Sequence, residues 1–267
     1  MKYFDKQNQR LIFIKEEATS SFWDNQWKAG DPLKVIKSGR CERFVFPITS
    51  RYLPPNEGFK ILEGGCGKGS FVYSLASRGY HAYGVDFAKE TVKNINAAMP
   101  ELNVIEADVR KLPFKENFFD GYWSLGVIEH FYEGYNEIAQ EMQRVIKPGG
   151  YLFLTFPYMS PLRKLKAKLG CYPILSQSKN KPSNFYQFAL NPQVTQKHFE
   201  QLGFSLVAAR PFEGFKGLKE ESFPALKKLL QIVYDNKSFV CRIIDFTLSH
   251  IFAPISGHTI ILVLRKK

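Results

Sequence analysis

The stretch ILEGGCGKGS, residues 61–70, decides the fold class. Its first part is apolar and is typical of a buried strand. Three glycines follow at two-residue spacing, Gly65, Gly67 and Gly69, and a helical pattern opens at Ser70. Glycines at such a turn let the backbone approach a ligand, and the helix N-terminus presents free N–H groups. A dinucleotide-binding loop would need glycine in place of Ser70, so the pattern disfavours a nicotinamide cofactor.

Around this loop, apolar runs alternate with helical patterns from residue 60 to residue 157. The predicted strands are 60–64, 81–86, 102–108, 121–126 and 151–157, and the predicted helices are 70–79, 87–99 and 135–146. Such alternation is typical of parallel βαβ units with right-handed crossovers. The sequence therefore predicts an α/β fold, with a Rossmann-like, mostly parallel sheet that has helices on both faces.

The remaining segments are assigned around the core at 58–160. Residues 1–57 are predicted to form an N-terminal helical extension, and residues 161–190 a lid or insertion with a polar loop at 176–184. Residues 191–267 are predicted to complete the core. They carry a helical cap insertion, rich in lysine, at about 213–255, and the last apolar run is expected to pair back onto the sheet.

Carboxylates stand at the ends of three successive predicted strands, at Glu63, Asp86 and Asp108. In open α/β sheets this edge forms the ligand crevice. Asp86 follows Gly65 by 21 residues, a position from which a carboxylate can accept both ribose hydroxyls of a nucleoside. Asp108 can accept from an adenine amino group, although it could instead cap the following turn. Three carboxylates favour a cationic cofactor and would repel a phosphate-bearing one.

Four motifs in order resemble the class I S-adenosylmethionine-dependent methyltransferases, particularly the subgroup that acts on small molecules and lipids. They are ILEGGCGKG, YGVDFAKETV, ADVRKLPFKENFFDGYWSLGVIEHF and RVIKPGGYLFLTFP. The resemblance covers about residues 58–157. It implies that 58–160 is the S-adenosylmethionine-binding core and that the chain is an enzyme of the methyltransferase class.

The resemblance also implies roles for single residues. Glu63, where family members more often have Asp, would anchor the loop or the methionine amino group. The remaining cofactor-binding residues implied are Gly65, Cys66, Gly67 and Gly69 around methionine and ribose, Asp86 on the ribose hydroxyls, Phe87 on the adenine face, Asp108 and Val109 at the adenine edge, and Ser124 and Leu125 near the methionine end. Phe87 could instead belong to the core. No metal site is predicted.

The reaction implied is direct displacement, in which an acceptor nucleophile attacks the sulfonium methyl. Alignment and exclusion of water are then the main tasks of the enzyme. For an oxygen nucleophile, His130 is the candidate general base because it follows the fourth strand and has a neutral-range pKa. A packing or capping role for His130 is the alternative.

The formal net charge of +12 is distributed unevenly. Residues 61–156 carry −3, whereas residues 157–267 carry +11. The excess therefore belongs to the segments expected to cover the acceptor. The stretch 162–169 interleaves leucine with arginine and lysine, which is typical of an amphipathic basic helix at a lipid surface, although a solvated lysine face is the alternative.

These features favour a small-molecule acceptor, anionic or amphiphilic, such as a glycan, a lipid or a secondary metabolite. An RNA or protein methyltransferase is the alternative, but the chain has Ser-Leu-Gly-Val at 124–127 instead of an Asn-Pro-Pro-Tyr-like tetrapeptide. A non-catalytic cofactor-binding protein is a third hypothesis. The sequence does not predict the oligomeric state.

Four separated cysteines and no signal-peptide pattern predict a cytoplasmic location, with peripheral attachment to an anionic inner membrane face as a further hypothesis. The apolar stretch at 239–255 is interrupted by Arg242, Asp245 and His250. It is therefore not predicted to span a membrane.

Overall fold

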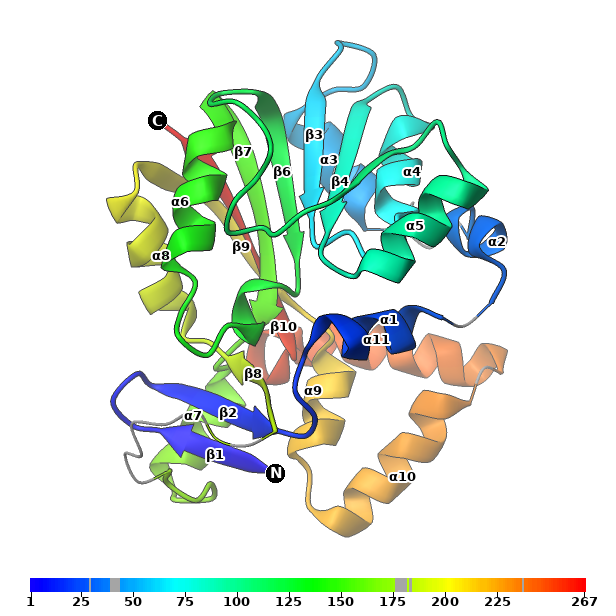
Figure 1. The fold of residues 1–267 in the computed structure, drawn as a ribbon. Coiled ribbons are helices and arrows are strands. Elements are labelled where there is room, and N and C mark those ends of the chain that lie inside the picture. Colours follow the sequence, from blue (N-terminus) through cyan, green and yellow to red (C-terminus); the bar gives the residue numbers. More distant parts are fainter. Residues whose placement is uncertain (29, 39–43, 176–181, 183, 237) are drawn as a thin grey trace.

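The computed structural model describes residues 1–28, 30–38, 44–175, 182, 184–236 and 238–267. Its centre is a seven-stranded sheet with the order β5-β4-β3-β6-β7-β10-β9 (Figure 1). The strands are β3 Lys60–Gly64, β4 His81–Asp86, β5 Asn103–Glu106, β6 Phe119–Leu125, β7 Ile146–Pro157, β9 Phe204–Phe212 and β10 Thr259–Lys266. β3 to β7 pair in parallel, and β10 runs antiparallel between β7 and β9. The predicted fold class is confirmed, and the last strand does pair back onto the sheet.

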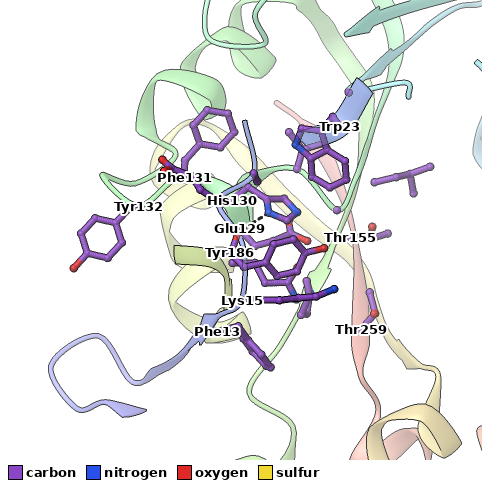
Figure 2. A pocket seen from close by; sticks show the side chains of 18 of the residues that line it. Phe13, Lys15, Trp23, Glu129, His130, Phe131, Tyr132, Thr155, Tyr186 and Thr259 are labelled. Atoms are coloured by element: carbon purple, nitrogen blue, oxygen red, sulfur yellow. Dashed lines mark hydrogen bonds between the residues drawn. The ribbon is translucent and has the colours of Figure 1, made fainter. Parts of the chain in front are cut away.

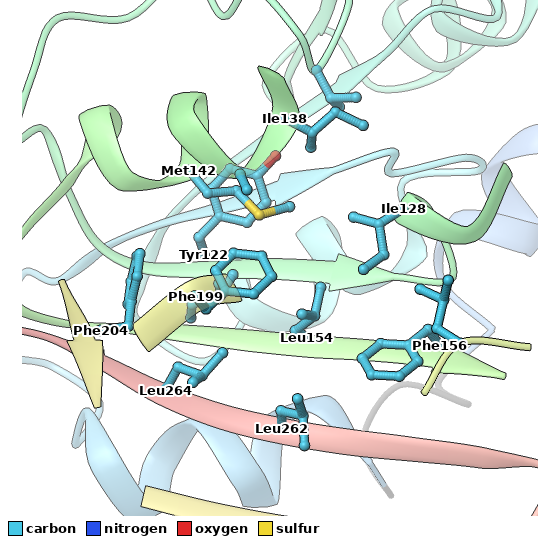
Figure 3. Close-up of a cluster of buried hydrophobic side chains, with 14 of the residues drawn as sticks. Tyr122, Ile128, Ile138, Met142, Leu154, Phe156, Phe199, Phe204, Leu262 and Leu264 are labelled. Carbon is cyan, nitrogen blue, oxygen red and sulfur yellow. The ribbon is translucent and has the colours of Figure 1, made fainter. Parts of the chain in front are cut away.

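Helices cover both faces of this sheet because its strands bury side chains on both sides. α6 Asn136–Val145 and α8 Pro192–Gln201 pack on one face, whose core contains Leu62. Tyr122 and Leu154 belong to the same core (Figure 3). The other face of the sheet is covered by α3 Val45–Tyr52, α4 Ser70–Ala76 and α5 Lys89–Ala98. Its core contains Ile61, Trp123 and Phe153, each adjacent in sequence to a residue of the first core. Successive residues of a strand thus enter opposite cores, as the period of two requires.

The order of the strands positions the site. The chain runs from β3 through β4 to β5 at one edge and then returns to β6 on the other side of β3. Helical connections therefore leave β3 and β6 in opposite directions. This topological switch point opens a crevice at the carboxyl ends of the two strands, which is where open α/β sheets bind ligands.

The N-terminal segment departs from the prediction. α1 Ser20–Trp27, α2 Pro32–Ile36 and α3 are helical as expected, but β1 Lys2–Asp5 and β2 Arg10–Ile14 form a hairpin that joins β8 Phe185–Ala189 in a second, three-stranded sheet. A helical extension is therefore wrong for residues 2–14. Leu11 and Ile12 are both buried, in different clusters, so β2 lacks the alternation that would have marked it as a strand.

The predicted cap insertion lies between β9 and β10, and its described residues form three helices. They are α9 Gly214–Glu221, α10 Pro224–Asp235 and α11 Phe239–Ser256. In Figure 1, α10 and α11 extend to one side of the molecule, below the main sheet.

The predicted lid at 161–190 begins with α7 Pro161–Lys168 and ends with β8. In the polar loop predicted at 176–184, residues 176–181 and 183 lie outside the described residues. α7 is only in part the solvent-facing basic helix that the sequence suggested, since Lys164 and Lys168 are exposed but Arg163 and Lys166 are not. Arg163 is fully buried and its Nε lies 3.0 Å from Oε1 of Glu221, while Nζ of Lys166 lies 3.1 Å from the other oxygen of the same carboxylate. A buried anion therefore directs part of the basic face inward.

Candidate active site

A cavity of about 1590 Å³ lies at the carboxyl ends of β3, β4, β6 and β7. Three parts of the chain build its wall. The core contributes Gly65, Asp86, Phe87, Asp108, Val109, Leu125, Glu129, His130 and Thr155; the N-terminal segment contributes Phe13, Lys15, Trp23 and Trp27; and the cap side contributes Phe212, Lys216, Lys227, His258 and Thr259. Figure 2 shows the part around His130. The structure thus brings seven of the predicted site residues together at one cavity.

The glycine loop takes the sharp turn that its composition predicts. Gly65, Gly67 and Gly69 have φ of 76, 48 and 71°, in the left-handed region that favours glycine. The amides of Gly65 and Cys66 both donate to the carbonyl of Val85, at 2.8 and 2.9 Å. A Cβ added at Gly67 would lie 3.2 Å from the Trp27 ring, so this glycine also permits the close approach of α1.

Asp86 joins the glycine loop to the turn that follows β4. Its Oδ2 accepts from the amide of Gly67 at 2.8 Å, and its Oδ1 accepts from the amide of Ala88 at 2.9 Å. Burial raises the pKa of this carboxyl above its ordinary value, and the backbone hydrogen bonds oppose that rise. Each carboxylate oxygen keeps further lone-pair capacity, and Asp86 lines the cavity. The geometry therefore fits the predicted contact with ribose hydroxyls.

Five predicted cofactor residues, all within the described chain, lie behind the cavity wall: Glu63, Cys66, Gly67, Gly69 and Ser124. Glu63 is buried and accepts a hydrogen bond from the backbone of Val72 in the first turn of α4. Burial, with the charge of Asp86, raises the pKa of Glu63 well above its ordinary value. This placement fits the anchoring of the loop, the first of the two roles predicted for Glu63.

The predicted adenine end combines an aromatic face with a paired carboxylate. Phe87 lines the cavity and is 43% exposed, as a stacking platform would be, and is not a core residue. Asp108 also lines the cavity, but it accepts from the Arg110 amide at 2.8 Å and pairs with the Arg110 guanidinium at 2.6 Å. That pair lowers the pKa of Asp108. Asp108 thus caps the following turn, and both of its oxygens accept hydrogen bonds from Arg110. Its contact with the adenine amino group stays a prediction.

Two tryptophans on α1 form a wall that the sequence analysis did not assign to the site. The rings of Trp23 and Trp27 stack at 5.6 Å with an interplanar angle of 18°. Trp23 also makes an edge contact with the His130 ring at 5.1 Å. Their spacing of four residues places both on one helix face, a signal that was visible in the sequence but gave no partner.

His130 is held between Trp23 and Tyr186 (Figure 2). Its Nδ1 lies 2.8 Å from the backbone carbonyl of Tyr186. A carbonyl only accepts, so Nδ1 carries the proton and Nε2 keeps its lone pair. Burial lowers the pKa of His130 to about 4, so the ring is neutral at physiological pH.

Glu129 is a second titratable group that the sequence analysis missed. Its side chain lines the cavity and is 2% exposed, and its Oε2 has no hydrogen-bond partner among the described residues. Burial raises its pKa to about 8. A buried carboxyl with an unsatisfied oxygen in a cavity is a typical binding or catalytic group. Its neighbour His130 had drawn the sequence-based assignment instead.

Known proteins share this architecture. The methyltransferase-domain family matches residues 62–154, the stretch that contains the glycine loop, Asp86 and His130. An S-adenosylmethionine-dependent methyltransferase from Mesorhizobium loti superposes with a TM-score of 0.56 at 16% identity, covering 86% of this chain and 99% of that one. Residues 62–154 therefore form a methyltransferase domain, and the fold is that of the S-adenosylmethionine-dependent methyltransferases. The family and these structural neighbours imply S-adenosylmethionine as the cofactor.

One further solved structure and one further sequence are similar to this chain. A methyltransferase from Methanosarcina mazei has a TM-score of 0.54 at 19% identity, covering 83% of this chain and 98% of that one. In sequence, the chain is 27% identical over 176 residues to a demethylmenaquinone methyltransferase from Staphylococcus aureus, covering 59% of this chain and 73% of that protein. The family match at 62–154 lies in the core, whereas Phe13, Trp23 and Tyr186 of the cavity wall lie outside it.

Proposed function

We propose that this methyltransferase acts on a small-molecule acceptor with an oxygen nucleophile, and that His130 is the general base. The assignment of His130 as the base rests on the hydrogen bond from its Nδ1 to the Tyr186 carbonyl at 2.8 Å. It fixes the tautomer with Nε2 as acceptor. Burial keeps the ring unprotonated, but the pKa of about 4 also makes it a weaker base than a free imidazole. His130 can therefore take the acceptor's proton without first losing one.

The cavity supports this choice of acceptor class. Its volume of about 1590 Å³ is large for one cofactor alone, because ordinary small-molecule sites occupy roughly 300–1,000 Å³. The wall is largely apolar and aromatic around His130, with Phe13, Trp23 and Tyr186 (Figure 2). The relative from Staphylococcus aureus is named for a small organic acceptor, which also favours this class. A glycan, a lipid or a secondary metabolite remains the proposed range.

S-adenosylmethionine, when bound, supplies a methyl group activated by a cationic sulfur. The residues fit such a group: Asp86 would hold the ribose, Phe87 would face the adenine, and the unsatisfied Oε2 of Glu129 offers an acceptor for a cation or donor. Trp23 packs against His130 and Trp27 stacks on Trp23, so an aromatic wall that would keep water away lines this side of the site. Alignment of donor and acceptor in such a site supplies most of the rate, and proton removal adds about 10²–10⁴-fold.

The test begins with the cofactor and then the acceptor. Calorimetry with S-adenosylmethionine and with NAD should give heat only for the former. Release of S-adenosylhomocysteine is then measured with phenols, glycans and lipids, and in parallel with RNA and protein. Turnover confined to RNA or protein would refute the small-molecule proposal. No turnover with any class, despite cofactor binding, would favour the non-catalytic alternative.

The base is tested with His130→Asn, whose amide can still donate to the Tyr186 carbonyl but has no basic nitrogen. We expect kcat to fall by about 10²–10⁴-fold while cofactor affinity stays within about twofold. Unchanged kcat would remove His130 from catalysis. Loss of cofactor affinity with unchanged kcat would assign it a positioning role.

A further inference from the structure

The helices α10 and α11 expose an apolar face that has no partner in the described part of the chain. α10 has no buried residue, and Leu229 and Ile232 lie on its surface. On α11, the exposed fractions reach 77% at Phe239 and 66% at Phe246. A surface helix normally turns its apolar stripe toward the core, so this arrangement is inverted.

On α11 the solvent-facing apolar residues recur at helical spacing. Exposed apolar residues form two adjacent rows, Phe239, Ile243 and Phe246 in one and Val240, Ile244, Ile251 and Ile255 in the other. Arg242, Asp245 and Ser249 share a different side of the helix, with spacings of three and four. The charged groups thus lie apart from the apolar face, as in helices that lie in a membrane interface, while the ring of His250 lies on that face against Phe246.

By length and composition α11 could cross a membrane, but its two ends exclude that arrangement. Its N-terminal end connects through α10 to α9, and its C-terminal end leads directly into β10, a central strand of the main sheet. The C-terminal part also packs on α9, where a Cβ at Gly214 would lie 2.3 Å from the Ala253 amide. Both ends therefore return to the same body, and α11 can only lie along a surface.

Charge favours an anionic bilayer over a second copy as the occupant of this face. Lys228 and Arg242 are exposed and make no ion pair within the described residues. The segment from residue 157 onward carries a net charge of +11, so two copies meeting here would bring like charges together. Anionic headgroups would instead complement these cations.

The face also adjoins the cavity. Lys216 of α9 and Lys227 of α10 line it, so α10 carries both an exposed apolar stripe and part of the wall. In Figure 1, α9, α10 and α11 lie together below the main sheet. We propose that α10 and α11 bind flat on an anionic bilayer and place this end of the cavity at the lipid surface, where an amphiphilic acceptor enters. The part that concerns the acceptor rests on the proposed function.

The experiment uses the full chain and vesicles of phosphatidylcholine with or without 30% phosphatidylglycerol, in the absence of cofactor. We expect the protein to float with the anionic vesicles at least tenfold more strongly than with the neutral ones, and less at 0.5 M salt. Ile243→Glu combined with Phe246→Glu should reduce partitioning at least tenfold. Arg242→Gln should reduce it about fivefold.

Val194→Glu is the matched control, because Val194 is also exposed but lies on α8. It should float as the parent does. Calorimetry with S-adenosylmethionine shows that each variant is folded. Failure of the parent to float, or equal flotation of the Ile243/Phe246 variant, would overturn the proposal. A dimer in light scattering that this variant dissociates, without vesicle binding, would assign the face to a second copy and would also overturn it.

The vesicle result does not depend on methyl transfer, so the two proposals fail separately. Once an acceptor is identified, the Ile243/Phe246 variant should keep its turnover on acceptor dissolved in water and lose at least tenfold on acceptor embedded in vesicles. Equal loss on both would refute the role in acceptor entry.

Discussion

Glu129→Gln should make the protein more stable at alkaline pH. The folded-state pKa of Glu129 is raised to about 8 by burial, against an ordinary value of 4.5. The native state therefore favours the protonated form, and this contribution to stability is fully present below pH 4.5 and lost as pH rises toward 8. The two pKa values differ by about 3.5, which corresponds to about 5 kcal/mol of unfolding free energy. Gln is neutral and nearly isosteric, so it escapes that loss.

The assay is urea unfolding of the parent and variant at pH 5, 7 and 9, followed by tryptophan fluorescence. The difference in unfolding free energy should be small at pH 5 and should grow with pH, up to about 5 kcal/mol at pH 9. Glu101→Gln, an exposed site on the loop before β5, is the control and should show no such growth. A difference that stays below about 1 kcal/mol at every pH would refute a desolvated, unpartnered Glu129. Saturating S-adenosylmethionine should shrink the difference if a cationic ligand faces this carboxyl.

Three further predictions follow from the contacts. Glu221→Gln should destabilise the protein by about 3 kcal/mol at pH 7 in urea unfolding, because the cations around Glu221 lower its pKa to about 2; in the parent this stability should disappear as pH falls from about 4.5 to 2. Equal acid sensitivity of parent and variant would contradict it. Asp86→Asn should weaken S-adenosylmethionine binding about 10–100-fold by calorimetry, and unchanged affinity would remove the ribose assignment. Trp27→Ala should weaken it about fivefold, and no change would show that α1 covers only the loop.

The core was predictable because its local signals agree with one another. The run at 61–64 is followed by left-handed glycines and a helix start, and each step permits only a few conformations. The hairpin at 2–14 was missed for the opposite reason. Both faces of β2 are covered, because Ile12 packs into the main core and Leu11 packs against Tyr172 and Met159. Its strand partner β8 lies 171–178 residues away, so no local period marks the strand.

The site also contains residues that local sequence predicts and residues that only long-range packing brings into place. Asp86 and Phe87 follow directly from the end of a predicted strand, and the structure places both on the cavity wall. Glu129 gives no comparable signal, because its importance depends on burial beneath segments that come from elsewhere in the chain. Tyr186, which fixes the tautomer of His130, belongs to a strand of the small sheet and lies 56 residues away. Long-range packing, rather than spacing, decides these two groups.

The charge of the cap region is also redistributed by folding. Sequence counting treats Arg163 and Lys166 as part of a basic surface, but Glu221 accepts hydrogen bonds from both and from Lys2 of β1. Arg163 further donates to the carbonyls of Tyr158 and His258, so a buried network ties α7, α9 and β1 to the end of β7. Breaking such a pair from one side leaves an uncompensated buried charge, which costs about 3–5 kcal/mol. These cations therefore act on the packing of the cap, and the positive charge available to an acceptor or a membrane is restricted to exposed residues such as Lys228 and Arg242.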